Sequence, residues 1–135
     1  MGRRARVIVL DTHALIWLAA EPERLGDGAR DAIAAEADRA ISTISAQEIA
    51  YLVLRGRIEL DRPVRVWIAD VLRTHEVRAV APGVAIAVRA GSLDAAKFPG
   101  DPADRLIYAT ALEHGGRVAS ADERLRALDP ARIIW

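Results

Sequence analysis

Residues 7–18 read VIVLDTHALIWL. The β-branched run at 6–10 predicts a short, buried strand. After Asp11 the apolar residues recur at helical spacing, which predicts a helix over residues 12–20. The stretch therefore indicates a strand that leads directly into a helix, with an acidic residue at the junction between them.

The same alternation of strand and helix continues along the chain. Apolar patterning predicts further strands at 40–44, 77–80, 117–120 and 132–135, helices at 29–38, 45–54, 64–75, 84–90, 102–114 and 123–128, and a turn at 26–28. Such alternation is typical of an α/β fold with a mainly parallel sheet. We expect one domain over residues 1–135, a three-layer sandwich with a sheet of four or five strands flanked by helices.

Charge and composition narrow the classes of function. The chain has 19 basic and 19 acidic residues, so a nucleic-acid site has to be a local basic patch. It has no cysteine, which excludes disulfides, thiol catalysis and cysteine-ligated zinc and fits a reducing cytoplasm. No apolar run approaches the roughly 20 residues of a membrane helix, and Asp11 interrupts the first one too early for a signal peptide. We expect a cytoplasmic protein with no membrane partner.

Four acidic residues fall where predicted strands and helices meet. They are Asp11 after the first strand, Glu48 and Asp104 in the first turns of their helices, and Asp122 after the fourth strand. In an open parallel sheet, ligands bind beyond the carboxyl ends of the strands, near helix N-termini. We therefore expect the four side chains to line one pocket. His13 either borders this pocket or lies on the surface of its helix.

Each acid also has a structural explanation as a helix cap. Asp11 and Asp122 precede helices, where a carboxylate accepts hydrogen bonds from free N–H groups. Ser45-x-x-Glu48 has the spacing of a capping box, and Asp101-x-x-Asp104 resembles one. Capping accounts for any one of these acids taken alone.

The four acids together point to a metal ion. Carboxylates that converge at one edge repel each other unless a cation lies between them. An all-oxygen site suits a hard divalent ion, Mg²⁺ or Mn²⁺. The reaction that best suits such a site is hydrolysis of a phosphodiester bond.

Four motifs, in order along the chain, resemble those of PIN-domain nucleases, specifically the VapC-type toxins of type II toxin–antitoxin pairs. They are VIVLDTHALIWL at 7–18, ISAQEI at 44–49, FPGDPADRLIYATA at 98–111 and ASADERL at 119–125, and the ending IIW at 133–135 is also similar. The resemblance covers essentially the whole chain.

The resemblance implies an endoribonuclease dependent on Mg²⁺ or Mn²⁺, whose catalytic and metal-binding residues are Asp11, Glu48, Asp104 and Asp122. Asp11 and Asp104 would bind the metal most firmly. Glu48 and Asp122 would bind it directly or through water.

Three further residues belong to the expected surroundings of this site. Ser120 stands where the family often has threonine, and its hydroxyl would border the acids. Asp101 is assigned to the helix cap, although the reverse assignment with Asp104 stays open. Arg105 would contact either a phosphate of the substrate or the neighbouring Asp104.

The resemblance also implies partners: an RNA substrate, a small VapB-type antitoxin and a second copy of the chain in a homodimer. The helix at 45–54 carries more apolar residues than one core-facing side needs, and Trp17 and Trp67 add large apolar area. Arg55 and Arg57 flank Gly56 and could follow an RNA backbone.

Other functions are open to different degrees. A phosphorylatable receiver domain is also α/β with acids and Mg²⁺, but Lys97, the only lysine, lies before a helix rather than after a late strand. A PIN nuclease for RNA processing outside a toxin pair, and a catalytically silent PIN fold that only binds partners, both remain alternatives.

Overall fold

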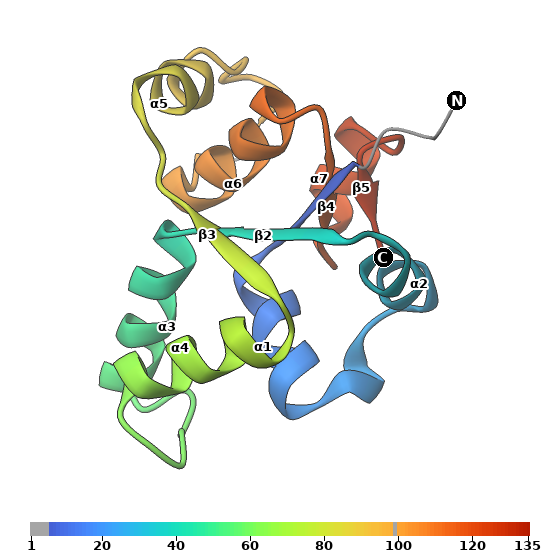
Figure 1. Cartoon of the computed structure of the whole chain (residues 1–135). Coiled ribbons are helices and arrows are strands. Elements are labelled where there is room, and N and C mark those ends of the chain that lie inside the picture. The colour runs from blue at the N-terminus through green and yellow to red at the C-terminus, as the bar shows by residue number, and fades with distance from the viewer. Residues whose placement is uncertain (1–5, 99) are drawn as a thin grey trace.

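The protein folds around a five-stranded, all-parallel sheet, seen in a computed structural model that describes residues 6–98 and 100–135 (Figure 1). The strands are β1 (Val7–Leu10), β2 (Asp38–Ser42), β3 (Val77–Val80), β4 (Arg117–Ala119) and β5 (Ile133–Ile134). Their order across the sheet is β3-β2-β1-β4-β5. The predicted parallel α/β sandwich is confirmed.

Helices cover both faces of this sheet. They are α1 (Thr12–Ala20), α2 (Asp27–Ala35), α3 (Ile44–Leu54), α4 (Val64–Thr74), α5 (Val84–Gly91), α6 (Pro102–Glu113) and α7 (Glu123–Leu128), with a short 3₁₀ turn at Pro22–Arg24. Helices α1 to α4 pack on one face, and α5 to α7 pack on the other (Figure 1). No helix within 6–98 and 100–135 is long and apolar enough to cross a bilayer.

Strand β1 explains why the first apolar run decides the fold. Val7 and Val9 pack into the core under α6, whereas Ile8 and Leu10 face the core formed with α1 to α4. All four are buried, which is the reason for a continuous apolar run rather than an alternating one. Each such side chain contributes about 1.5–3 kcal/mol when it leaves water.

The predicted boundaries differ most from the structure at α2 and β2, where the helix predicted at 29–38 is Asp27–Ala35. The predicted turn at 26–28 is the start of α2, with Gly26 as the N-cap. Strand β2 lies two residues earlier than predicted because its pairing with β1 sets the register, with Asp38 opposite Val7. The hydrogen bonds of the ladder thus recruit two polar residues, Asp38 and Arg39, which the apolar pattern does not assign to a strand.

The order of the strands creates a crevice next to β1. The chain adds β2 and β3 on one side of β1 and then crosses to the other side to form β4 and β5. Both β2 and β4 pair with β1, so the direction of winding reverses at this strand. Ligands bind at such a switch point, beyond the carboxyl ends of the strands, which here precede Asp11 and Ser120.

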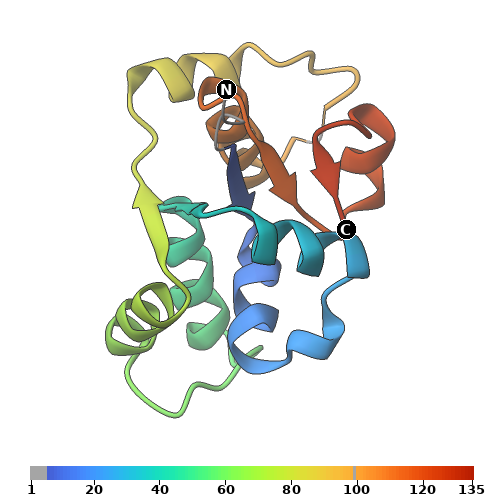
Figure 2. The ribbon, with the colours of Figure 1, turned by 45° about the vertical axis from the view of Figure 1, so that its right-hand side comes forward.

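Three glycines lie in close contact with the backbone of distant residues near the two ends of the chain. Trp135, after β5, packs against the start of α2, where its backbone closely approaches Gly26 and Gly28 (Figure 2). Gly116, just before β4, lies against the backbone of Val7 at the start of β1. These close contacts require glycine because a side chain would occupy the same space as backbone atoms.

We predict that Gly116→Ala lowers the free energy of unfolding by about 1–3 kcal/mol. A Cβ at this position would lie 2.3 Å from the carbonyl oxygen of Val7, so β1 and β4 would have to separate locally. Gly83→Ala is the matched control, because its Cβ would have no atom within 4 Å. Urea unfolding of the two variants measures the difference, and equal midpoints would contradict the close contact.

Candidate functional site

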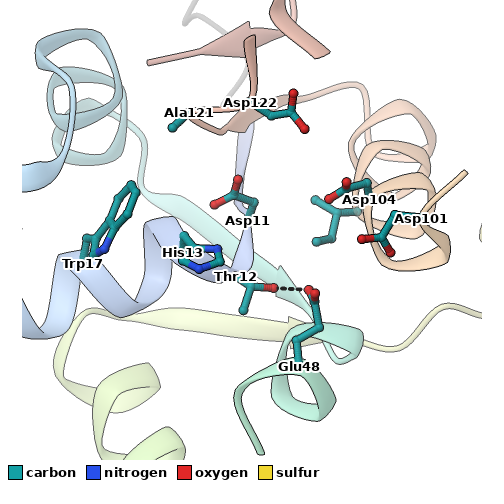
Figure 3. A pocket seen from close by; sticks show the side chains of 10 residues that line it. Asp11, Thr12, His13, Trp17, Glu48, Asp101, Asp104, Ala121 and Asp122 are labelled. Carbon is teal, nitrogen blue, oxygen red and sulfur yellow. Dashed lines mark hydrogen bonds between the residues drawn. The ribbon is translucent and has the colours of Figure 1, made fainter. Parts of the chain in front are cut away.

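The four predicted acids line one pocket at the carboxyl edge of the sheet. The pocket is a cavity of about 480 Å³ (Figure 3). Its walls are formed by Asp11, Thr12, His13, Trp17, Glu48, Asp101, Asp104, Ile107, Ala121 and Asp122. The structure therefore brings together residues that are separated by up to 111 positions in the sequence, from 11 to 122.

Asp11 is both a helix cap and a wall of the pocket. Its carboxylate accepts a hydrogen bond of 2.8 Å from the N–H of Ala14 at the start of α1. Burial raises the pKa of Asp11, although hydrogen bonds with Ser120 and with the Ala14 N–H act in the opposite direction. Capping and pocket formation are thus compatible roles of one carboxylate rather than alternatives.

Glu48 reaches the pocket from α3, and the predicted capping box is wrong. The helix begins at Ile44, so Ser45 lies inside the helix, and the side chain of the N-cap residue Thr43 makes no capping hydrogen bond. The N–H of Ile44 donates instead to the hydroxyl of Ser42 at 3.3 Å. The hydroxyl of Thr12 instead donates to the Glu48 carboxylate, and its oxygen lies 3.0 Å from that of Ser45. Because a hydroxyl has one proton, Ser45 donates to Thr12, which donates to Glu48.

The two acids at the start of α6 have different surroundings. Asp101 caps the helix by accepting from the N–H of Ala103 at 2.9 Å, as predicted. Asp104, one turn later, is not the cap and lies beside the other acids. Burial, followed by the negative charges of Asp101, Asp122, Glu48 and Asp11, raises the pKa of Asp104 to about 7.

Asp122 and Ser120 both follow β4, but only Asp122 lines the pocket. Asp122 accepts hydrogen bonds from the N–H groups of Arg124 and Leu125 and so caps α7. Ser120 is fully buried, and its hydroxyl accepts from the N–H of Asp122. Since Ser120 also hydrogen-bonds Asp11, this serine links the ends of β1 and β4.

Arg105 is directed elsewhere. Its guanidinium donates to the carbonyl oxygens of Ala90 at 3.0 Å and Leu93 at 2.8 Å, and it lies near the ring of Phe98. Arg105 does not line the pocket. Helical geometry explains the difference, because neighbouring residues on α6 face directions about 100° apart. We therefore assign Arg105 to holding the segment after α5.

Four residues of the pocket were not predicted for it from the sequence: Thr12, Trp17, Ile107 and Ala121. Thr12 holds Glu48, which is 36 positions away, and no local pattern indicates that pairing. Trp17 was expected at an interface with another chain but lines the pocket. His13 lies between Trp17 and Asp11 in the close-up view (Figure 3). It borders the pocket and is also exposed on the surface of α1, so both descriptions of its position apply.

The pocket has the donor set of a site for a hard cation. Its polar lining within the described chain is five carboxylates, one hydroxyl and one imidazole, without lysine or arginine. Within 6–98 and 100–135, no group of three or more acidic or imidazole side chains is arranged to hold a metal ion by itself. Such an arrangement fits Mg²⁺, which retains several waters and takes only one or two direct carboxylate ligands.

Comparison with known proteins agrees with this architecture. The PIN domain family model matches residues 8–130 of the chain. A curated relative, Ribonuclease VapC22 from Mycobacterium tuberculosis (strain ATCC 25618 / H37Rv), is 43% identical over 120 residues, which make up 89% of this chain and 90% of the relative. The chain therefore belongs to the PIN domain family and, within it, to the VapC-type proteins.

Proposed function

We propose that the chain is an endoribonuclease dependent on Mg²⁺ or Mn²⁺ and the toxin of a VapBC-type toxin–antitoxin pair, with residues 1–135 as one nuclease unit. The observation that carries the proposal is the convergence of Asp11, Glu48, Asp104 and Asp122 on one pocket. The raised pKa of Asp104 supports it, because the shift comes from burial and then from the neighbouring negative charges, and a bound cation would offset both effects. The likeness to a protein named a ribonuclease supports RNA as the substrate.

Each acid has a distinct part in this proposal. Asp11 and Asp104 hold the cation, while Glu48 and Asp122 bind it directly or through water. When bound, a divalent cation polarises the phosphoryl oxygen and lowers the pKa of water. Glu48 orients the attacking water, because the hydroxyl of Thr12 fixes its carboxylate on the pocket side. Ser120 positions Asp11.

The proposed partners are a VapB-type antitoxin and a second copy of the chain, in the cytoplasm. Exposed apolar side chains on α3 and α5 support these contacts, notably Tyr51, Leu54, Val84 and Val88. We expected Trp67 to add apolar area to an interface with a partner. That prediction is wrong, because Trp67 is buried in the core of its own chain. Its ring faces inward because α4 packs its most apolar side against α1 and α3.

The test is cleavage of RNA by the purified protein with Mg²⁺, Mn²⁺ or excess EDTA. We expect cleavage with either metal and a loss of at least about 100-fold in EDTA, because the cation contributes several kcal/mol at the phosphoryl group. Restoring Mn²⁺ after chelation should restore the rate. Equal cleavage in EDTA would overturn the metal mechanism, and no cleavage under any condition would favour a silent PIN fold.

A further inference from the structure

A second cavity adjoins the pocket of acids. It also measures about 480 Å³ and shares two wall residues with the first cavity, His13 and Trp17. It lies between α1, the 3₁₀ turn at Pro22–Arg24 and the segment after α3 that contains Arg57. A strand of RNA whose phosphate lies at the acids would therefore have this cavity directly beside it.

Flat side chains form much of its wall. The rings of His13 and Trp17 are 5.6 Å apart between centroids and inclined by 52°. The guanidinium carbon of Arg24 lies 4.5 Å from the centre of the Trp17 ring. The third aromatic side chain, Trp67, is buried and contributes to the same lining. The two rings are tilted rather than stacked, and the ring of Trp135 also lies 5.5 Å from that of Trp17. Aromatic and guanidinium groups are the surfaces on which unpaired bases bind.

The wall of the second cavity contains two arginines, Arg24 and Arg57, and two glutamates, Glu21 and Glu59. Helix α3 ends at Leu54, and the φ of 69° at Gly56 lets the N–H of Arg57 bond to the carbonyl of Leu52. This helix end leads the chain to the cavity, where Arg57 lines the wall. Its guanidinium has no hydrogen bond or ion pair with any other residue in 6–98 and 100–135, whereas Arg24 is paired with Glu21.

We propose that this second cavity binds one unstacked base of the RNA substrate, next to the phosphate that is cut, and that Arg57 contacts the adjoining backbone phosphate. The inference rests on the proposed function, because the strand has to reach the acids. Trp17 and His13 would be contacts for the base, and the cavity would select single-stranded over duplex RNA. The shared wall of the two cavities supports a base, because the nucleotide next to a phosphate at the acids would reach the second cavity.

The first experiment removes single bases from the RNA substrate rather than side chains from the protein. Oligoribonucleotides carry a single abasic residue at each position around a site that the wild-type protein cuts. We expect one position next to the cut to lower kcat/KM roughly tenfold, as for the loss of one stacking contact. Trp17→Leu should lower cleavage of the intact RNA to a similar extent and abolish the additional effect of the abasic residue.

A second variant is needed because Trp17 also packs against the core, so Trp17→Leu could lose activity through a folding defect. Arg57→Ala changes an exposed side chain that makes no hydrogen bond or ion pair within the described part of the chain, and it should weaken RNA binding several-fold. Arg65→Ala is the matched control because Arg65 is exposed on α4, makes no ion pair among the described residues and lines neither cavity. Its RNA affinity should equal that of the wild type.

The readouts separate this inference from the proposed function. Binding is also measured with the Asp11→Asn protein, so the base effect is visible even if no RNA is cut. Absence of cleavage by the wild type would refute only the nuclease function. Equal binding and cleavage at every abasic position would overturn the base site. So would Trp17→Leu and Arg57→Ala variants that lose affinity for the antitoxin but not for RNA.

Discussion

Asp11→Asn should lower the rate of RNA cleavage by about 1,000-fold and leave the fold intact. Asparagine has nearly the same shape and still accepts the hydrogen bond from the Ala14 N–H that caps α1. It loses the negative charge that would hold the cation, and a loss of about 4 kcal/mol at the transition state corresponds to this factor. Single-turnover cleavage and thermal unfolding of the same preparation test both parts.

The control for this substitution is Asp31→Asn. Asp31 is exposed on α2 and has no side-chain hydrogen bond or ion pair within 6–98 and 100–135. The variant should cleave RNA at the wild-type rate. Full cleavage by Asp11→Asn would remove Asp11 from the mechanism, and a large fall in its unfolding temperature would show that its role is structural.

Asp104→Asn should stabilise the metal-free protein above neutral pH. The folded pKa of Asp104 is about 7, against an ordinary value of 3.8. Between these values the folded protein holds a proton that the unfolded chain has released, so stability falls as the pH rises through this window. The variant removes that loss, about 1 kcal/mol at pH 8 once screening at this partly exposed site is allowed for.

Asp101 provides the contrast within the same helix turn. Asp101→Ala removes the cap of α6 and should cost about 1 kcal/mol, the opposite sign from Asp104→Asn. Urea unfolding at pH 5 and pH 8 without metal compares the two variants. A stability gain for Asp104→Asn that is as large at pH 5 as at pH 8 would contradict the raised pKa as its cause.

Asp104→Asn also tests whether the pocket binds a cation. Mn²⁺ at 100 times its dissociation constant should stabilise the wild type by about 2.7 kcal/mol, or roughly 10 °C in the unfolding temperature. Asp104→Asn should lose most of this shift, because it removes a proposed ligand. A variant that is stabilised by Mn²⁺ as strongly as the wild type would exclude Asp104 from the metal site.

The local rules of chain conformation explain what could be predicted without the structure. The order of strands and helices follows from apolar periodicity, and the caps at Asp11, Asp101 and Asp122 follow from their places before helices. Where the prediction was wrong, contacts with distant residues had changed a local preference. Pairing with β1 makes β2 begin at Asp38, two residues earlier than predicted. Helix α3 begins at Ile44, one residue earlier than predicted, so Ser45 lies inside it.

The sequence by itself therefore determined the α/β class, the strand-to-helix junctions and the placement of four acids at or near them, because each depends on residues close together in the chain. Only the tertiary structure decided that β4 lies beside β1, and hence that Asp122 faces the same pocket as Asp11. It also decided that Thr12 holds Glu48 and that Trp17 joins two cavities. These contacts arise from packing between distant segments, and no local pattern encodes them.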